Sequence, residues 1–216
     1  MLEMFGYMLV LYLFVGVFAS GVDITYGQVT GLEYIFYPFS NETGKFALMS
    51  MICNITISLV TIVLFLKRCD QHISMMCYEY KNNNRYKLLY SQKRDLYKCV
   101  MAIVGAKIIV DFISMIGVQV FSIETFVHLT LSYTLTSILW IDALYVIRLY
   151  KINSNVAFFV MIVGVLISIL IQKYLKLTFF AYCASTNYIY DYIVKGILII
   201  VLHVMEIYMI KNADLY

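Results

Sequence analysis

The chain has 216 residues, of which 62% are hydrophobic and only 13% are charged, and its mean hydropathy is +0.84. A soluble protein of this size needs a largely polar surface, so the composition excludes an ordinary soluble domain and predicts that apolar side chains face lipid. The formal net charge is +3, but the cations crowd into short connectors between apolar runs. They do not form the basic face of a nucleic-acid-binding module, and no nucleic-acid partner is expected.

Six apolar stretches are close to the length of about 20 residues with which a helix crosses a bilayer. They cover residues 4–20, 46–66, 99–121, 126–147, 156–171 and 193–210. Transmembrane strands would alternate apolar and polar residues, whereas these stretches are apolar on all sides. The predicted fold class is therefore all-α: a polytopic membrane protein with about six transmembrane helices in one domain over residues 1–216.

The first stretch admits a second interpretation, because Val17 and Ala19 match the small-residue pattern of a signal-peptidase site. The residues that precede the stretch contain no Lys or Arg, which a cleaved signal normally has. We therefore expect a retained helix.

Lys and Arg are distributed unequally between the two sets of connectors, and cytoplasmic connectors are the ones enriched in these residues. One side holds eleven of them, eight within residues 67–98, and the other side holds three. This asymmetry predicts that both termini lie in the cytoplasm. Residues 67–98 then form a cytoplasmic basic loop, and residues 172–192 form an outer connector rich in Phe and Tyr.

Tyr and Leu alternate with cations in the basic loop, which favours one or two short helices at the membrane surface. A solvated loop held by anionic lipid is the alternative. Cys69, His72 and Cys77 lie close together in this segment, but they are too few and wrongly spaced for a common zinc site. No metal or other cofactor is expected.

Ionisable residues inside predicted spans are costly and are therefore functional candidates. Lys107 and Asp111 are four residues apart, which places them on one helical face where they can neutralise each other. Asp142 has no local partner, so it either meets Lys107 or another polar group across a helix interface, or lines a wet pathway. His203 and Glu206, near the cytoplasmic end of the last span, are spaced to form one hydrogen-bonded pair.

The basic loop also contains an acidic residue, a polar run, a Leu pair, and then Ser, Arg and Tyr before the next span. These residues are Glu79, Leu88, Leu89, Ser91, Arg94 and Tyr97. Together with the six spans, the inside termini and the aromatic segment between the last two spans, the pattern resembles the permease subunits of type-2 ABC exporters.

The resemblance implies a multi-pass permease in the cell membrane that works with a second permease subunit, the same or related, and exports an unidentified substrate. It also implies that the basic loop acts like a coupling helix that docks on a separate ATP-binding subunit. The contact candidates are Glu79, Arg85, Lys87 and Arg94. The alternative is a non-transporting membrane subunit of a larger complex.

No enzymatic activity is expected of the chain itself. It contains no phosphate-cradling GxxxxGK loop followed by Ser or Thr, so ATP hydrolysis would have to come from a partner. An intramembrane enzyme would need a clustered catalytic set, and neither an HExxH nor a GxSxG motif occurs.

Overall fold

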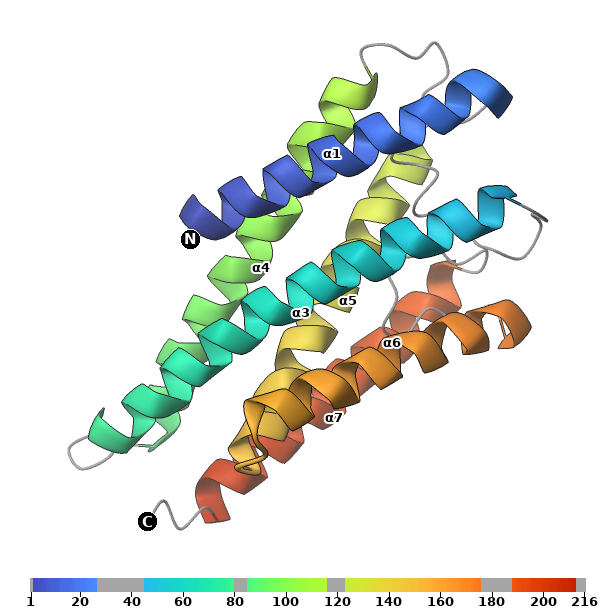
Figure 1. Cartoon of the computed structure of the whole chain (residues 1–216). Helices are drawn as coiled ribbons and strands as arrows, with labels where there is room; N and C mark the ends of the chain where they lie inside the picture. Colours follow the sequence, from blue (N-terminus) through green and yellow to red (C-terminus); the bar gives the residue numbers. More distant parts are fainter. Residues whose placement is uncertain (1, 27–44, 80–84, 116–122, 176–187, 213–216) are drawn as a thin grey trace.

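The computed structural model describes residues 2–26, 45–79, 85–115, 123–175 and 188–212 (Figure 1). These residues are almost entirely helical, and none of them belongs to a strand. The helices are α1 (Leu2–Tyr26), α3 (Lys45–Glu79), α4 (Arg85–Met115), α5 (Ile123–Leu149), α6 (Ser154–Leu175) and α7 (Tyr188–Asn212). The predicted all-α class is confirmed, and each predicted span coincides with one of these helices over its described part.

Helix α5 occupies the centre of the bundle. It packs against α3, α4, α6 and α7, while α1 lies along α4 and also contacts α3. Figure 1 shows the end of α3, the start of α4, the α5–α6 turn and the end of α7 at the same lower-left side of the molecule. The topology therefore brings the chain's most polar segments to one end of the bundle.

The bundle exposes rows of apolar side chains and buries several charged ones, and a soluble protein rarely does either. The outward side of α7 exposes a row of apolar side chains along its whole length: Ile189, Ile193, Ile197, Ile200, Val204 and Tyr208. Helices α1 and α6 expose similar rows. Buried positions, in contrast, hold Lys93, Lys107, Asp142, Lys195 and Glu206. Exposed apolar surface of this extent marks contact with lipid or with other proteins.

Two segments of the described chain are long and apolar enough to cross a membrane. They are Phe126–Leu149 on α5, most of which is buried in the bundle, and Ile189–Ile210 on α7, little of which is buried. Shorter apolar helical segments are Leu2–Phe14 and Ser154–Ser168. The apolar segments thus include both a central helix and peripheral helices.

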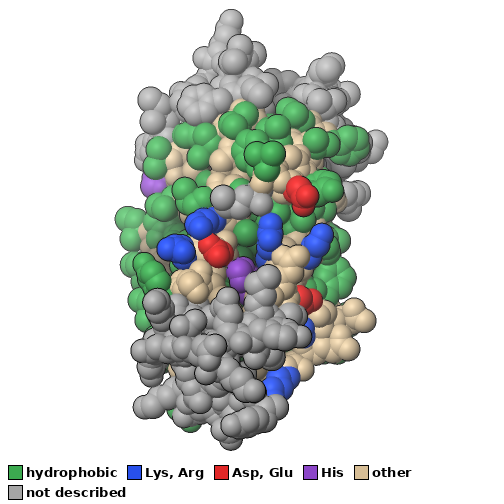
Figure 2. All heavy atoms as spheres, turned by 90° about the vertical axis from the view of Figure 1, so that its left-hand side faces the viewer, with side chains coloured by type: hydrophobic (Ala, Val, Ile, Leu, Met, Phe, Trp, Pro, Cys, Tyr) green, Lys and Arg blue, Asp and Glu red, His purple; other side chains and the backbone are tan. Residues whose placement is uncertain are grey.

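Most of the predicted basic loop is helical, because α3 continues to Glu79 and α4 begins at Arg85. In place of separate surface helices, the two long helices extend through this segment. With 35 residues, α3 is roughly 52 Å long at about 1.5 Å per residue, whereas a hydrocarbon core is about 30 Å thick. Figure 2 shows charged side chains gathered in a band on this side of the molecule, below a field of hydrophobic side chains.

An ion pair and a hydrogen bond, both made by Asp70, join α3 to the residues that flank the α5–α6 turn. Lys151 adopts a positive φ of 58° after the end of α5, and Asn153 caps α6 by accepting a bond from the Asn155 amide. Asp70 of α3 contacts the Arg148 Nε at 2.5 Å and accepts a hydrogen bond from Ser154 at 2.8 Å. These contacts fix the polar end of α5 against α3.

Candidate functional site

A buried lysine ties three helices together at the polar end of the bundle. The Lys93 Nζ on α4 lies 3.0 Å from the Asp142 Oδ1 on α5 and 2.5 Å from the Glu206 Oε2 on α7. The three side chains are only 6%, 1% and 0% exposed, respectively. A single ammonium group therefore bridges two carboxyl groups in the interior.

Tyr97 and His203 complete this arrangement, which we call the Lys93 cluster: Lys93, Tyr97, Asp142, His203 and Glu206. Lys93 donates to the Tyr97 hydroxyl at 3.3 Å, and that hydroxyl donates to the Asp142 Oδ2 at 3.3 Å. Burial raises the pKa of Tyr97 to about 12, so its hydroxyl keeps the proton that it donates. The His203 Nδ1 lies 3.2 Å from the Lys93 Nζ and 3.3 Å from the Glu206 Oε2.

The charge on Lys93 is held in place by its neighbours. Burial alone would lower the pKa of Lys93, but the attraction of Asp142 and Glu206 outweighs burial and raises the pKa above its ordinary value. Lys93 is therefore an ammonium ion at neutral pH. Buried charges of this kind persist only when they are paired and hydrogen-bonded.

Hydrogen bonds beside the cluster set the position of α4. The Tyr145 hydroxyl of α5 donates to the Gln92 Oε1 at 2.7 Å, and the Gln92 Nε2 donates to the His72 carbonyl of α3 at 3.2 Å. Because Gln92 precedes Lys93 in the chain, these bonds hold Lys93 at the depth of its carboxylate partners.

The segment around Cys69 does not supply a metal site among the residues that the structure describes. Burial raises the pKa of the Cys69 thiol, which keeps it protonated at neutral pH. The described residues contain no group of three His, Cys, Asp or Glu side chains arranged to hold a metal ion. Cys77, the third member of the sequence pattern, lies outside the described side chains.

A second buried ion pair lies further along the interface between α5 and α7. The Lys195 Nζ is 2.8 Å from the Asp191 Oδ2, and it donates to the Ser132 Oγ at 2.8 Å. Ser132 in turn donates to Asp191 at 3.1 Å. Next to this triad, the Tyr192 ring stacks on His128, with 5.9 Å between the ring centroids. Lys195 lies within the predicted span 193–210 but was not among the predicted site residues.

Lys107 is buried on α4, and its Nζ lies 5.6 Å from the centroid of the Tyr133 ring on α5. Its predicted partner Asp111 is on α4, but the Asp111 side chain lies outside the described part of the chain. The Lys107–Asp111 pair therefore stays a prediction. The partner that the structure gives Asp142 is Lys93 and not Lys107.

The structure brings together three predicted site residues, Asp142, His203 and Glu206. Arg94, a predicted ATPase contact, is exposed on α4 next to the buried Lys93. The side chains of the other contact candidates lie outside the described residues: Glu79, Arg85 and Lys87. Sequence reasoning missed Lys93 and Tyr97 as cluster members because it placed both in a cytoplasmic loop.

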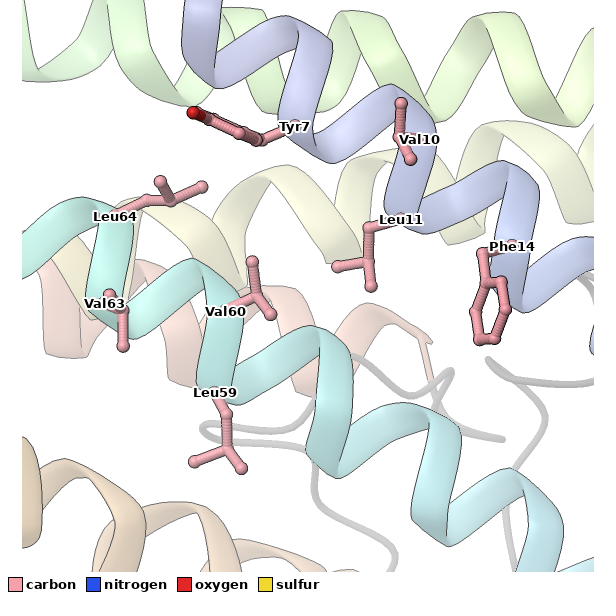
Figure 3. Close-up of a pocket in the computed structure, with 8 residues that line it drawn as sticks. All are labelled: Tyr7, Val10, Leu11, Phe14, Leu59, Val60, Val63 and Leu64. Carbon is pink, nitrogen blue, oxygen red and sulfur yellow. The ribbon is translucent and has the colours of Figure 1, made fainter.

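A groove of about 580 Å³ lies between α1 and α3, away from these charges (Figure 3). Its lining comprises Tyr7, Val10, Leu11, Phe14, Leu59, Val60, Val63 and Leu64. Figure 3 shows apolar side chains from both helices around the groove, with the Tyr7 hydroxyl as the one oxygen among the drawn side chains. The groove suits hydrocarbon, and none of its lining residues is charged.

Comparisons of the chain with protein-family models, with curated proteins and with solved structures found no match. The chemistry of the Lys93 cluster and the polarity of the bundle therefore carry the functional assignment.

Proposed function

We propose that this chain is a multi-pass membrane protein with six transmembrane helices and cytoplasmic termini, and that it acts as the membrane-embedded subunit of a transport system. The observation that carries this proposal is the Lys93 cluster, which lies inside a bundle with an apolar exterior. Asp142, His203 and Glu206 of this cluster lie in predicted spans, where ionisable groups are expensive and typically mark ion or substrate pathways.

The buried polar groups lie at several depths along the bundle, which favours a transport pathway over a single polar contact that only stabilises the fold. Ser132 and Asp142 are ten residues apart on α5, which corresponds to about 15 Å along the helix, or roughly half a hydrocarbon core. Lys107 is buried on the neighbouring helix α4. Polar partners at successive depths lower the barrier for an ion or a small polar solute.

The extensions of α3 and α4 support a specific form of the proposal, the permease of an ABC exporter. These extensions reach beyond the length that a bilayer requires and carry exposed cations, including Arg94. A separate ATP-binding subunit that docks here would move the first turns of α4. Because Lys93 adjoins Arg94, this movement would act directly on the cluster.

Charge reversal at Arg94 tests the docking. We expect Arg94→Glu to reduce the amount of ATP-binding subunit that co-purifies with the chain by at least about tenfold, as a mismatched interface charge does. Lys151→Glu is the matched control, because it reverses an exposed cation on the α5–α6 turn. Equal recovery of an ATPase with the wild type and both variants would exclude docking at Arg94, and recovery of none would exclude the ABC form.

The second candidate function is a non-transporting subunit of a larger membrane complex. The continuous exposed apolar row on α7 favours it, because such a row fits a partner helix as well as lipid. In that case, purification would recover other membrane-spanning chains in fixed stoichiometry and no ATPase.

A further inference from the structure

We infer that the Lys93 cluster is a binding site for one exchangeable proton, shared between the His203 Nδ1 and the Glu206 carboxyl group. The inference rests on the proposed transport function in its general form, a pathway for an ion or a small polar solute, and not on its ABC form. The site itself is defined by charge and geometry.

The charge count of the cluster calls for a proton. Lys93 contributes one positive charge, and Asp142 and Glu206 contribute two negative charges when both are ionised. A neutral His203 leaves one excess negative charge among side chains that are at most 6% exposed, apart from His203 itself. One added proton makes the cluster neutral, on either His203 or Glu206.

The His203 Nδ1 can make one of two hydrogen bonds, and its protonation state decides which one. Its Nδ1 is 3.2 Å from the Lys93 Nζ and 3.3 Å from the Glu206 Oε2. The Lys93 ammonium can donate to Nδ1 only when Nδ1 carries no proton, and Nδ1 can donate to Glu206 only when it does carry one. Proton uptake at Nδ1 therefore moves the His203 hydrogen bond from Lys93 to Glu206.

The two carboxylate oxygens of Glu206 are unequally satisfied. Oε2 contacts both Lys93 and His203, whereas the buried Oε1 has no hydrogen-bond partner among the described residues. A buried anionic oxygen without a donor is unfavourable, and a proton on the carboxyl group removes that charge. His203 is 48% exposed and Glu206 is 0% exposed, so the histidine connects the carboxyl group to the outside.

The other polar groups near the cluster do not compete for this proton. On α4, Tyr97 holds its proton because burial raises its pKa to about 12, and Gln92 is uncharged. On α5, the Tyr145 hydroxyl donates to Gln92 and is neutral. On α3, the raised pKa of Cys69 keeps its thiol protonated. The exchangeable proton is thus confined to Lys93, Asp142, His203 and Glu206, of which the ammonium of Lys93 is already fully protonated.

The test measures how many protons the purified full chain takes up and compares the wild type with two variants, Glu206→Gln and His203→Gln. The uptake is measured between about pH 8 and pH 5, the range in which histidine titrates. For a shared site, Glu206→Gln removes about one proton per chain, because the remaining Lys93–Asp142 pair is neutral and His203 stays unprotonated beside Lys93. His203→Gln removes none, because the excess charge remains and the proton goes to Glu206.

An independent histidine gives the opposite pattern. In that case His203→Gln loses about one proton and Glu206→Gln loses none, a result that would overturn the inference. Glu3→Gln, at an exposed position on α1, is the control for removal of a carboxyl group. Circular dichroism checks that each variant is folded, and Asp142→Asn, which also neutralises the cluster, replaces Glu206→Gln if the latter does not fold.

Proton movement in reconstituted vesicles separates the site from the function. A pH-sensitive dye inside the vesicles should report proton entry with the wild type and a loss of entry with Glu206→Gln. If Glu206→Gln loses one proton and His203→Gln loses none, but no protons enter the vesicles, the site stands and its role in transport is overturned. If instead His203→Gln loses one proton and Glu206→Gln loses none, the shared site is overturned, whatever the vesicles show.

Discussion

Replacing Lys93 with Met is expected to lower the free energy of unfolding by about 3–5 kcal/mol, the largest effect in the chain. The substitution keeps most of the side-chain volume but leaves Asp142 and Glu206 buried without their common counter-ion. Removing one member of a buried ion pair costs this much because an uncompensated charge remains in the interior. Chemical denaturation in detergent, followed by circular dichroism, measures the change.

Two comparisons make this result specific to the cluster. Lys67→Met removes an exposed lysine of α3 and should change stability by less than about 0.5 kcal/mol. Neutralising the carboxyl groups as well, in Lys93→Met with Asp142→Asn and Glu206→Gln, should recover most of the loss. A triple variant that is less stable than Lys93→Met alone would contradict the paired geometry.

The same ion pairs set the direction of a pH effect. The pKa of Lys93 is raised by Asp142 and Glu206, so the folded state holds this proton more tightly than the unfolded chain does. The stabilisation is fully present below the ordinary lysine pKa of about 10.4 and is lost as the pH rises through the higher folded value. On the alkaline side, the stability difference between the wild type and Lys93→Met should therefore shrink only above the ordinary lysine pKa of about 10.4.

Lys195→Met is expected to have the second-largest effect, again about 3–5 kcal/mol of destabilisation. Lys195 is fully buried and lies 2.8 Å from Asp191 on the same helix, so its removal leaves a carboxylate buried with Ser132. Adding Asp191→Asn should restore most of the stability, because the neutral amide can still bond to Ser132. The measurement is the double-mutant cycle of the two substitutions.

The Lys98–Asp95 pair is the matched control for burial. It has the same chemistry and a similar separation of 2.7 Å, but its side chains are 48% and 46% exposed. Exposed pairs of this kind contribute at most about 1 kcal/mol, so Lys98→Met should be nearly neutral. Equal losses for Lys98→Met and Lys195→Met would contradict the buried setting of Lys195.

The helices were predictable because each apolar stretch is long and uniform, and the one proline of the sequence, Pro38, lies outside all six apolar stretches. Their ends were less predictable. Residues 67–79 and 85–98 are polar enough to suggest a loop, yet they continue α3 and α4, since neighbouring helices supply packing that composition does not reveal.

A periodic signal for Lys93 was nevertheless present in the sequence. Buried positions of α4 recur at alternating steps of four and three, and the lysines share this stripe with apolar residues: Leu89, Lys93, Leu96, Val100, Ile103, Lys107 and Val110. This is the repeat of a helix that packs along one seam. Extending the stripe of the predicted span back into the loop would have identified Lys93 as an interior residue.

The contacts between residues on different helices could not be predicted from the sequence. The local pair His203 and Glu206 could be proposed from a spacing of three residues, whereas Lys93 and Asp142 are 49 positions apart. Their contact depends on the depth at which α4 lies against α5. That depth is set by packing and by the bonds of Gln92 to Tyr145 and His72.

The lipid exposure of α7 tests the central claim, a charged interior inside a membrane-embedded bundle, most directly. Single spin labels would be placed in a bilayer-reconstituted chain without its five native cysteines, at exposed positions of α7: Ile193, Ile197, Ile200 and Val204. Electron paramagnetic resonance then compares collisions with oxygen, which partitions into lipid, and with a water-soluble nickel chelate. A label at Tyr90, exposed on the extension of α4, serves as the aqueous control. We predict that oxygen dominates at all four α7 positions and nickel at position 90, whereas nickel-dominated collisions at positions 197 and 200 would contradict the account.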